Sequence, residues 1–238
     1  MIGLDHIKSD RQFTGQDSSR VTGYHLSFTA APLRPELARI VAECFLTVGD
    51  WALVSERILS TNALQCRSAS SAVRLESEMR QRLETLTRDQ MVLLAQATVE
   101  DRTAMAWLAV CKRIRFAFEF AAEVLRDKLA AHDAVLRPSD YESYVENKCL
   151  PHPELGRLKP TSKNKIRQVL LKMLTEAGLL AKGSALTIHR PAVSPAVVRV
   201  ITADSPHWLA AFLVPALEIS PRRPSGICTN YPSGCSRR

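Results

Sequence analysis

A cation-rich stretch between residues 159 and 183 offers the chemistry that the sequence states most clearly. It reads KPTSKNKIRQVLLKMLTEAGLLAKG, and no acidic residue occurs from Arg157 to Lys172. Ammonium and guanidinium groups attract phosphates, while amide and hydroxyl side chains can hydrogen-bond to phosphate oxygens or base edges. These residue types indicate recognition of a polyanion, although a basic face that is merely solvated would have the same composition.

The apolar residues divide this stretch into two faces of one helix. Five of them recur at helical intervals and predict a buried stripe, namely Ile166, Val169, Leu170, Met173 and Leu174. Polar side chains that could contact DNA lie outside the stripe. We expect Asn164 and Gln168 to face a DNA groove, and Thr161 or Ser162 to be an N-cap beside free N–H groups that could receive a phosphate. The candidate phosphate ligands are Lys163, Lys165, Arg167, Lys172 and, in the following turn, Lys182.

A second basic surface is predicted in the N-terminal half, at the start of another helix. Arg67 and Arg74 flank Ser70 and Ser71, and three of these four positions share one side of the helix start. Their side chains could donate hydrogen bonds to phosphate oxygens. A capped helix start with a solvated face explains the same residues equally well.

The formal net charge of +8 is confined to one part of the chain. Residues 137–238 carry 15 basic and 7 acidic side chains, whereas residues 1–136 carry 17 of each. A localised positive field attracts polyanions and raises their encounter rate, so nucleic acid or an acidic protein surface is the natural partner. A solvated basic face that serves solubility is the alternative.

Helical periodicity in the rest of the chain indicates an all-α fold. One helix is expected to start near Pro35, Thr87 and Gln90 have the spacing of a capping box, and Thr98 can cap the helix after it. From Ser68 to Leu86 the charges alternate in sign, which is typical of a solvated helix face. We expect a disordered segment over 1–22, a helical bundle over 23–136, a smaller basic domain over 137–217 and a disordered tail over 218–238.

The smaller domain has the element order of a winged helix-turn-helix. A short helix and a turn precede the basic helix, Gly178 is suited to end that helix, and residues 185–189 resemble a strand that could pair with Leu179 and Leu180. The tail of a helical bundle with an incidental basic face is the alternative.

Catalytic and metal-binding patterns are missing from the sequence. No nucleophile elbow, glycine-rich phosphate loop or HExxH occurs, and the single CxxH, Cys149 with His152, has no second ligand pair. We therefore expect no enzymatic activity, no catalytic residue, no metal and no cofactor, and no small-molecule substrate. No apolar run approaches the length of a membrane helix and no secretory signal is evident, so we expect a cytoplasmic protein without a membrane partner.

Five segments together resemble a known family. They are GYHLSFTAAPL at 23–33, TVGDWALVSERIL at 47–59, LQCRSASSAVRL at 64–75, WLAVC at 107–111 and KIRQVLLKMLTEAGLL at 165–180. In order and spacing they resemble the BrxA family of bacterial BREX phage-defence systems, from about Tyr24 to Pro215. The resemblance implies a small non-enzymatic helical protein, related in fold to the antitermination factor NusB and associated with double-stranded DNA binding. Other BREX proteins are possible partners, and the residues after Leu217 depart from the family pattern.

Two classes of function remain open from the sequence. The first is a double-stranded DNA-binding accessory protein of a BREX system. The second is a scaffold or adaptor that docks an acidic protein partner or RNA through the same basic face. Net charge does not separate them, because both kinds of partner require cations.

Overall fold

The computed structural model describes residues 23–181, 183 and 186–219. Within this part the chain is helical, and β pairing is limited to isolated bridges. The expected all-α class is confirmed. Lys182 and the two terminal segments expected to be disordered lie outside the described residues, except that positions 218 and 219 belong to the last helix.

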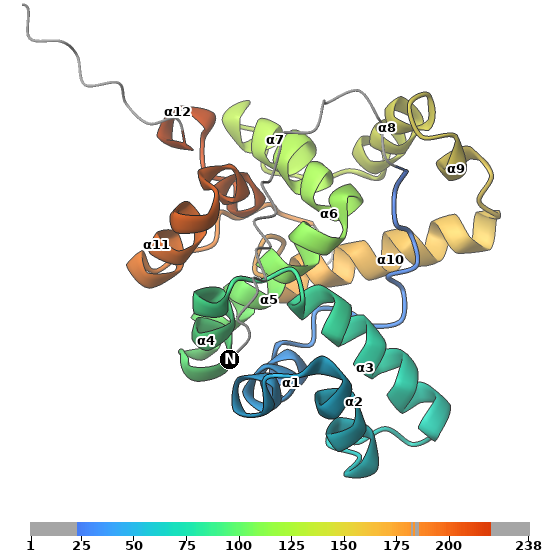
Figure 1. The fold of residues 1–238 in the computed structure, drawn as a ribbon. Coiled ribbons are helices and arrows are strands. Elements are labelled where there is room, and N and C mark those ends of the chain that lie inside the picture. The colour runs from blue at the N-terminus through green and yellow to red at the C-terminus, as the bar shows by residue number, and fades with distance from the viewer. Residues whose placement is uncertain (1–22, 182, 184–185, 220–238) are drawn as a thin grey trace, which may run out of the picture.

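In the described residues the elements are α1 (Pro35–Val48), α2 (Trp51–Ser60), α3 (Ala69–Leu83), α4 (Arg88–Gln96), α5 (Val99–Arg113), α6 (Arg115–Glu119), the π-helical segment η1 (Phe120–Leu125), α7 (Arg126–Ala130), α8 (Pro138–Cys149), α9 (Pro153–Gly156), α10 (Pro160–Glu176), α11 (Pro195–Asp204), the 3-10 helix η2 (Pro206–Phe212) and α12 (Ala216–Ile219). In the view of Figure 1 the first three helices lie at the bottom, α8 and α9 at the right, and α11 and α12 at the left.

Local signals in the sequence set several of the helix ends. Pro35 is the first residue of α1, where its fixed φ suits a helix and its missing N–H is not needed. The Thr87 hydroxyl accepts from the Gln90 N–H while the Gln90 side chain accepts from the Thr87 N–H, which confirms the predicted capping box. The hydroxyl of Thr98 accepts from the Asp101 N–H and confirms the predicted start of α5.

The centre of the core is α5. Every residue from Met105 to Cys111 is buried, because α1, α3, α4 and η2 surround this helix. Helix α11 packs on α4 and α5, and the Trp107 indole donates to the Ala211 carbonyl at 2.9 Å. Elements from both sides of the expected 136/137 boundary thus contribute to one core, and the division into two domains stays a prediction.

A minimal β pairing follows α10, the basic helix. The Ala181 N–H donates to Thr187 O at 2.8 Å and the His189 N–H donates to Leu179 O at 2.9 Å, while the Ile188 N–H reaches Ala134 O at 2.7 Å. These contacts bring residues 186–188 between two neighbouring segments as isolated antiparallel bridges. The comparisons with a winged helix and with NusB stay predictions.

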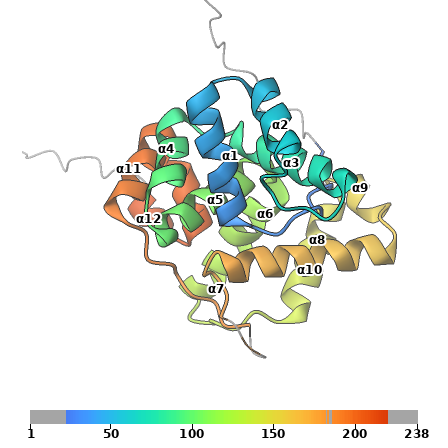
Figure 2. The same ribbon diagram turned by 90° about the horizontal axis from the view of Figure 1, so that it is seen from below.

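An extended segment, residues 24–33, runs between α10 and α3 before α1 begins (Figures 1 and 2). We call it the strap. Its polar groups are satisfied by side chains of other elements: Tyr24 N–H donates to Glu154 at 2.6 Å, and Leu33 N–H donates to Glu176 at 2.8 Å. Phe28 anchors it in the core with no exposed surface. The strap therefore ties α9 and α10 to the beginning of the bundle.

Helix α3 holds the other side of the strap. The Arg82 guanidinium donates to Ala31 O at 2.8 Å, to Pro32 O at 2.9 Å and to the Glu78 carboxylate at 2.8 Å. Glu76, Glu78 and Arg82 are each less than 9% exposed, so the expectation that all charges of this helix lie on a solvated face was wrong. Helix α3 can bury these charges because each is paired or hydrogen-bonded, which offsets the loss of hydration.

We predict that Arg82→Met will lower the free energy of unfolding by about 3–5 kcal/mol, because it leaves Glu78 buried without its cation and two carbonyls without a donor. The corresponding fall in Tm is roughly 10 °C. Arg39→Ala is the control, since its partners Glu36 and Glu43 are 58% and 46% exposed and the loss should stay below about 1 kcal/mol. Equal losses in the two variants, measured by thermal and urea denaturation, would contradict this role of Arg82.

Candidate nucleic-acid interface

A groove with a cavity volume of about 710 Å³ lies where the strap, α3 and α10 meet. It brings together residues that are far apart in the sequence. Two cations line it, Arg74 from α3 and Lys165 from α10, together with several apolar side chains. The hydroxyl groups along its lining belong to Ser27, Thr29, Ser71, Thr161 and Ser162. The two basic surfaces predicted separately from the sequence thus contribute to one groove.

Two helix N-termini face this groove. Ser71 lies in the first turn of α3, and Thr161 and Ser162 lie in the first turn of α10. The predicted N-cap at Thr161 or Ser162 was wrong: Lys159 is the N-cap, because Pro160 takes the first helical position that proline favours. No side chain caps α10. Positive ends of the helix dipoles and first-turn hydroxyls therefore add to the field of the two cations.

The acidic residues of α3 do not neutralise the groove. Glu76 and Glu84 pair with Arg80 at 3.1 and 2.9 Å, and Glu78 pairs with Arg82. Among the residues that the structure describes, no carboxylate lies within ion-pair distance of Arg74 or Lys165. Both cations are exposed and available to an anionic partner.

A buried polar cluster fixes the first residue of the strap. The Tyr24 hydroxyl and the Arg115 guanidinium donate to Glu119, and Lys148 donates to the same carboxylate at 2.6 Å. Burial alone would raise the pKa of Glu119, but the hydrogen bonds from Lys148, Tyr24 and Arg115 outweigh it and hold the pKa below its usual value. Burial, together with Glu119, raises the pKa of Tyr24, so its hydroxyl stays protonated and donates.

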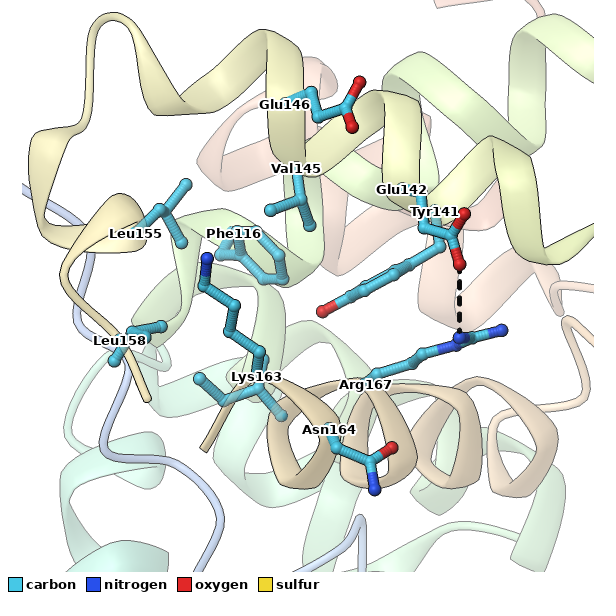
Figure 3. Close-up of a pocket in the computed structure, with 11 residues that line it drawn as sticks. Phe116, Tyr141, Glu142, Val145, Glu146, Leu155, Leu158, Lys163, Asn164 and Arg167 are labelled. Carbon is cyan, nitrogen blue, oxygen red and sulfur yellow. Dashed lines mark ion pairs between the residues drawn. The ribbon is translucent and has the colours of Figure 1, made fainter. Parts of the chain in front are cut away.

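Three other residues of α10 do not line the groove. Lys163, Asn164 and Arg167 line a second, smaller pocket between α8 and α10 (Figure 3). Arg167 lies 3.7 Å from the Glu142 carboxylate and 5.5 Å from the centre of the Tyr141 ring. The phosphate contact predicted for Arg167 stays a prediction, and it requires Arg167 to leave Glu142.

The remaining candidate residues lie outside both cavities. Gln168 and Lys172 are exposed farther along α10, and Arg67 is exposed just before Ser68, the N-cap of α3. Ser70 is exposed beside that N-cap, with the two hydroxyl oxygens 3.3 Å apart. The structure therefore brings Ser71, Arg74, Thr161, Ser162 and Lys165 together and leaves the others at the periphery.

Sequence reasoning missed the contribution of the strap. Ser27 and Thr29 line the groove, whereas their neighbour Phe28 is completely buried. This alternation of polar and apolar residues is the period of an extended strand. It was visible in the sequence, but no partner strand indicated which surface the polar side would face.

The histidine of the CxxH segment contacts the strap and α9. His152 is 2% exposed, its ring stacks on Tyr24 at 3.8 Å, and its Nδ1 lies 3.2 Å from Glu154. In the part of the chain that the structure describes, no group of three or more side chains is arranged to hold a metal ion. None of the described helices combines the length and the apolar character needed to cross a bilayer.

The fold and the groove define a small all-helical protein whose cations and hydroxyl groups gather between two helix N-termini. A family model identifies it further: the chain belongs to the BrxA family, whose model matches residues 22–205. It is 27% identical over 176 residues to the BREX protein BrxA of Escherichia coli O9:H4 (strain HS), covering 74% of this chain and 78% of that one. It is 28% identical over 152 residues to the BREX protein BrxA of Bacillus cereus (strain H3081.97), covering 63% and 76%.

A solved structure shares the fold. The crystal structure of an uncharacterized protein from Magnetospirillum magneticum superimposes with a TM-score of 0.70 at 19% identity. The match covers 81% of this chain and 98% of that chain. Nearly the whole of the Magnetospirillum magneticum protein thus has the same helical arrangement as this chain.

We predict that stability will fall as pH drops from about 4.5 through the lowered pKa of Glu119, because protonation removes the negative charge that strengthens hydrogen bonds from three donors. Above that window the carboxylate stays charged and its contribution is complete. Glu119→Gln should lose about 1–3 kcal/mol at neutral pH and should show a shallower loss of stability in acid than the parent protein. Glu56→Gln, at an exposed position of α2, is the control. Parallel acid profiles for Glu119→Gln and the parent would contradict the assigned role of this carboxylate.

Proposed function

We propose that this protein is a non-enzymatic, double-stranded DNA-binding accessory protein of a BREX bacteriophage-defence system. The observation that carries the proposal is the groove between the strap, α3 and α10, where Arg74 and Lys165 join hydroxyl groups from three segments. Family membership supports the BREX context, since both named relatives are BREX proteins.

The chemistry of the groove favours the sugar–phosphate backbone as its ligand. Phosphate oxygens accept hydrogen bonds from arginine, lysine and hydroxyl groups, and they are stabilised at helix N-termini. None of these contacts reads a base, so we expect little sequence preference from the groove itself. The protein then serves to hold or position DNA, and the chemical steps of defence belong to partner proteins.

Salt dependence is the first test. Each neutralised phosphate should contribute about 0.9 to the slope of log affinity against log salt concentration. Fluorescence anisotropy of a labelled duplex over a salt series should therefore give a negative slope, reduced by about 1.8 when two phosphate contacts are removed. An affinity that does not change with salt would contradict backbone recognition.

Charge reversal locates the interface. Arg74→Glu with Lys165→Glu should weaken duplex binding at least tenfold, equivalent to about 1.4 kcal/mol, because two attractive contacts become repulsive. The matched control is Arg57→Glu with Arg199→Glu, which changes the net charge equally at exposed positions of α2 and α11. Circular dichroism should show equal helicity in all three proteins.

Single substitutions separate the groove from the outer face of α10. Lys165→Glu should weaken binding more than Lys172→Glu, because only Lys165 lines the groove. Equal effects would favour the outer face of α10. No effect of either substitution, together with binding of an acidic protein or RNA in place of the duplex, would favour a scaffold or adaptor.

A further inference from the structure

A pocket lies between α8 and α10, and it is lined by other residues of α10 than the polar ones that line the groove (Figure 3). Its cavity volume is about 320 Å³, and Phe116, Val145, Leu155 and Ile166 supply much of its apolar lining. A cavity of about 150 Å³ holds a benzene ring. The pocket is therefore large enough for a one- or two-ring heterocycle.

The hydroxyl of Tyr141, a largely buried residue, faces this pocket. Tyr141 is only 7% exposed, and its hydroxyl points into the cavity in Figure 3. The nearby Tyr144 hydroxyl donates to Phe116 O at 3.0 Å, whereas no described residue lies within hydrogen-bonding distance of the Tyr141 hydroxyl. Burial raises the pKa of Tyr141 to about 12, so the hydroxyl is protonated and offers a donor. The hydroxyl is open to the cavity, where it can donate to a ligand.

The charges around the pocket restrict the kind of ligand. Lys163 adds a second donor from α10, while Glu142 and Glu146 place two carboxylates on the α8 side. Lys163 and Arg167 balance these two carboxylates, so the lining has no net charge that would select a phosphate or a carboxylate. A purely hydrocarbon ring would leave the Tyr141 hydroxyl unsatisfied. The pocket fits an uncharged planar ring whose edge carries both hydrogen-bond acceptors and N–H donors.

We propose that this pocket receives an unpaired nucleobase of the bound DNA, at a bulge or a single-stranded end. A base has the required edge, and bases outside a duplex commonly stack on aromatic and arginine side chains such as Tyr141 and Arg167. The pocket and the groove share Leu158 and Ile166 in their linings, so one strand can contact both. The inference rests on the proposed function, since it assigns a second feature of the same ligand.

Binding of two labelled duplexes tests the proposal. They have the same paired sequence, and one contains a single unpaired guanine at its centre. Guanine is chosen because its O6 and N7 both accept hydrogen bonds. The wild-type protein should bind the bulged duplex at least roughly fivefold more tightly, as expected for one stacked base. With 2-aminopurine as the unpaired base, its fluorescence should be quenched on binding.

Two variants connect that preference to the pocket. Val145→Phe fills the cavity, and Tyr141→Phe removes only the hydroxyl; neither residue lines the groove. Both should bind the paired duplex as the wild type does. Val145→Phe should abolish the preference for the bulge, and Tyr141→Phe should reduce it. Circular dichroism and Tm measurements establish that each variant is folded.

The outcomes distinguish this inference from the proposed function. Tight binding of the paired duplex with no preference for the bulge, or with a preference that both variants retain, overturns the pocket assignment and leaves the groove intact. No binding of the paired duplex overturns the proposed function. In that case the pocket assignment survives only if a single-stranded oligonucleotide binds and Val145→Phe abolishes that binding.

Discussion

The arrangement of the structure depends on the need to satisfy the backbone of an extended strap that has no sheet partner. Buried or partly buried N–H and C=O groups require hydrogen bonds, and the strap obtains them from charged side chains. Arg82 donates to Ala31 and Pro32, while Glu176 accepts from Leu33. Helices α3 and α10 are therefore fastened to the same short segment, which sets the space between them.

The space that remains between these helices is the groove. Burying Arg82 and Glu78 has a desolvation penalty, and burial lowers the pKa of Arg82 even though Glu78 opposes that shift. The pair lies in a position where Arg82 holds the strap and Glu78 is kept away from the outer surface. Arg74 and Lys165 then face the groove without a neighbouring carboxylate among the described residues. The internal ion pair and the positive external surface thus have a common structural origin.

Local features of this fold could be predicted from the sequence, and long-range ones could not. The capping box at Thr87 and the five-residue stripe from Ile166 to Leu174 depend on hydrogen bonds and periodicity within one helix, and both are confirmed. The sign alternation in α3 suggested a surface, because sequence spacing contains no information about the strap carbonyls that bury Arg82. Proline at the first position of α10 was visible, yet the hydroxyl residues after it gave a stronger but misleading cap signal.

The candidate site shows the same limit. Arg74 and Lys165 could each be identified as an exposed cation on a helix, but their convergence on one groove depends on tertiary packing. Arg167 has the same residue type and helical context as its basic neighbours, and only the position of Tyr141 and Glu142 on α8 shows that it points elsewhere. Ser27 and Thr29 line the groove only because of where the strap lies in the fold, and the sequence contains no information about that position.

Hydrogen–deuterium exchange with and without duplex DNA tests the central claim most directly. If the groove binds the DNA backbone, protection on complex formation should be concentrated in three separate segments, residues 24–33, 68–75 and 158–168. The peptides of α11 and α12 should exchange as they do in the free protein. The account would be contradicted if the protein bound the duplex while exchange in those three segments stayed unchanged and protection appeared only in other helices.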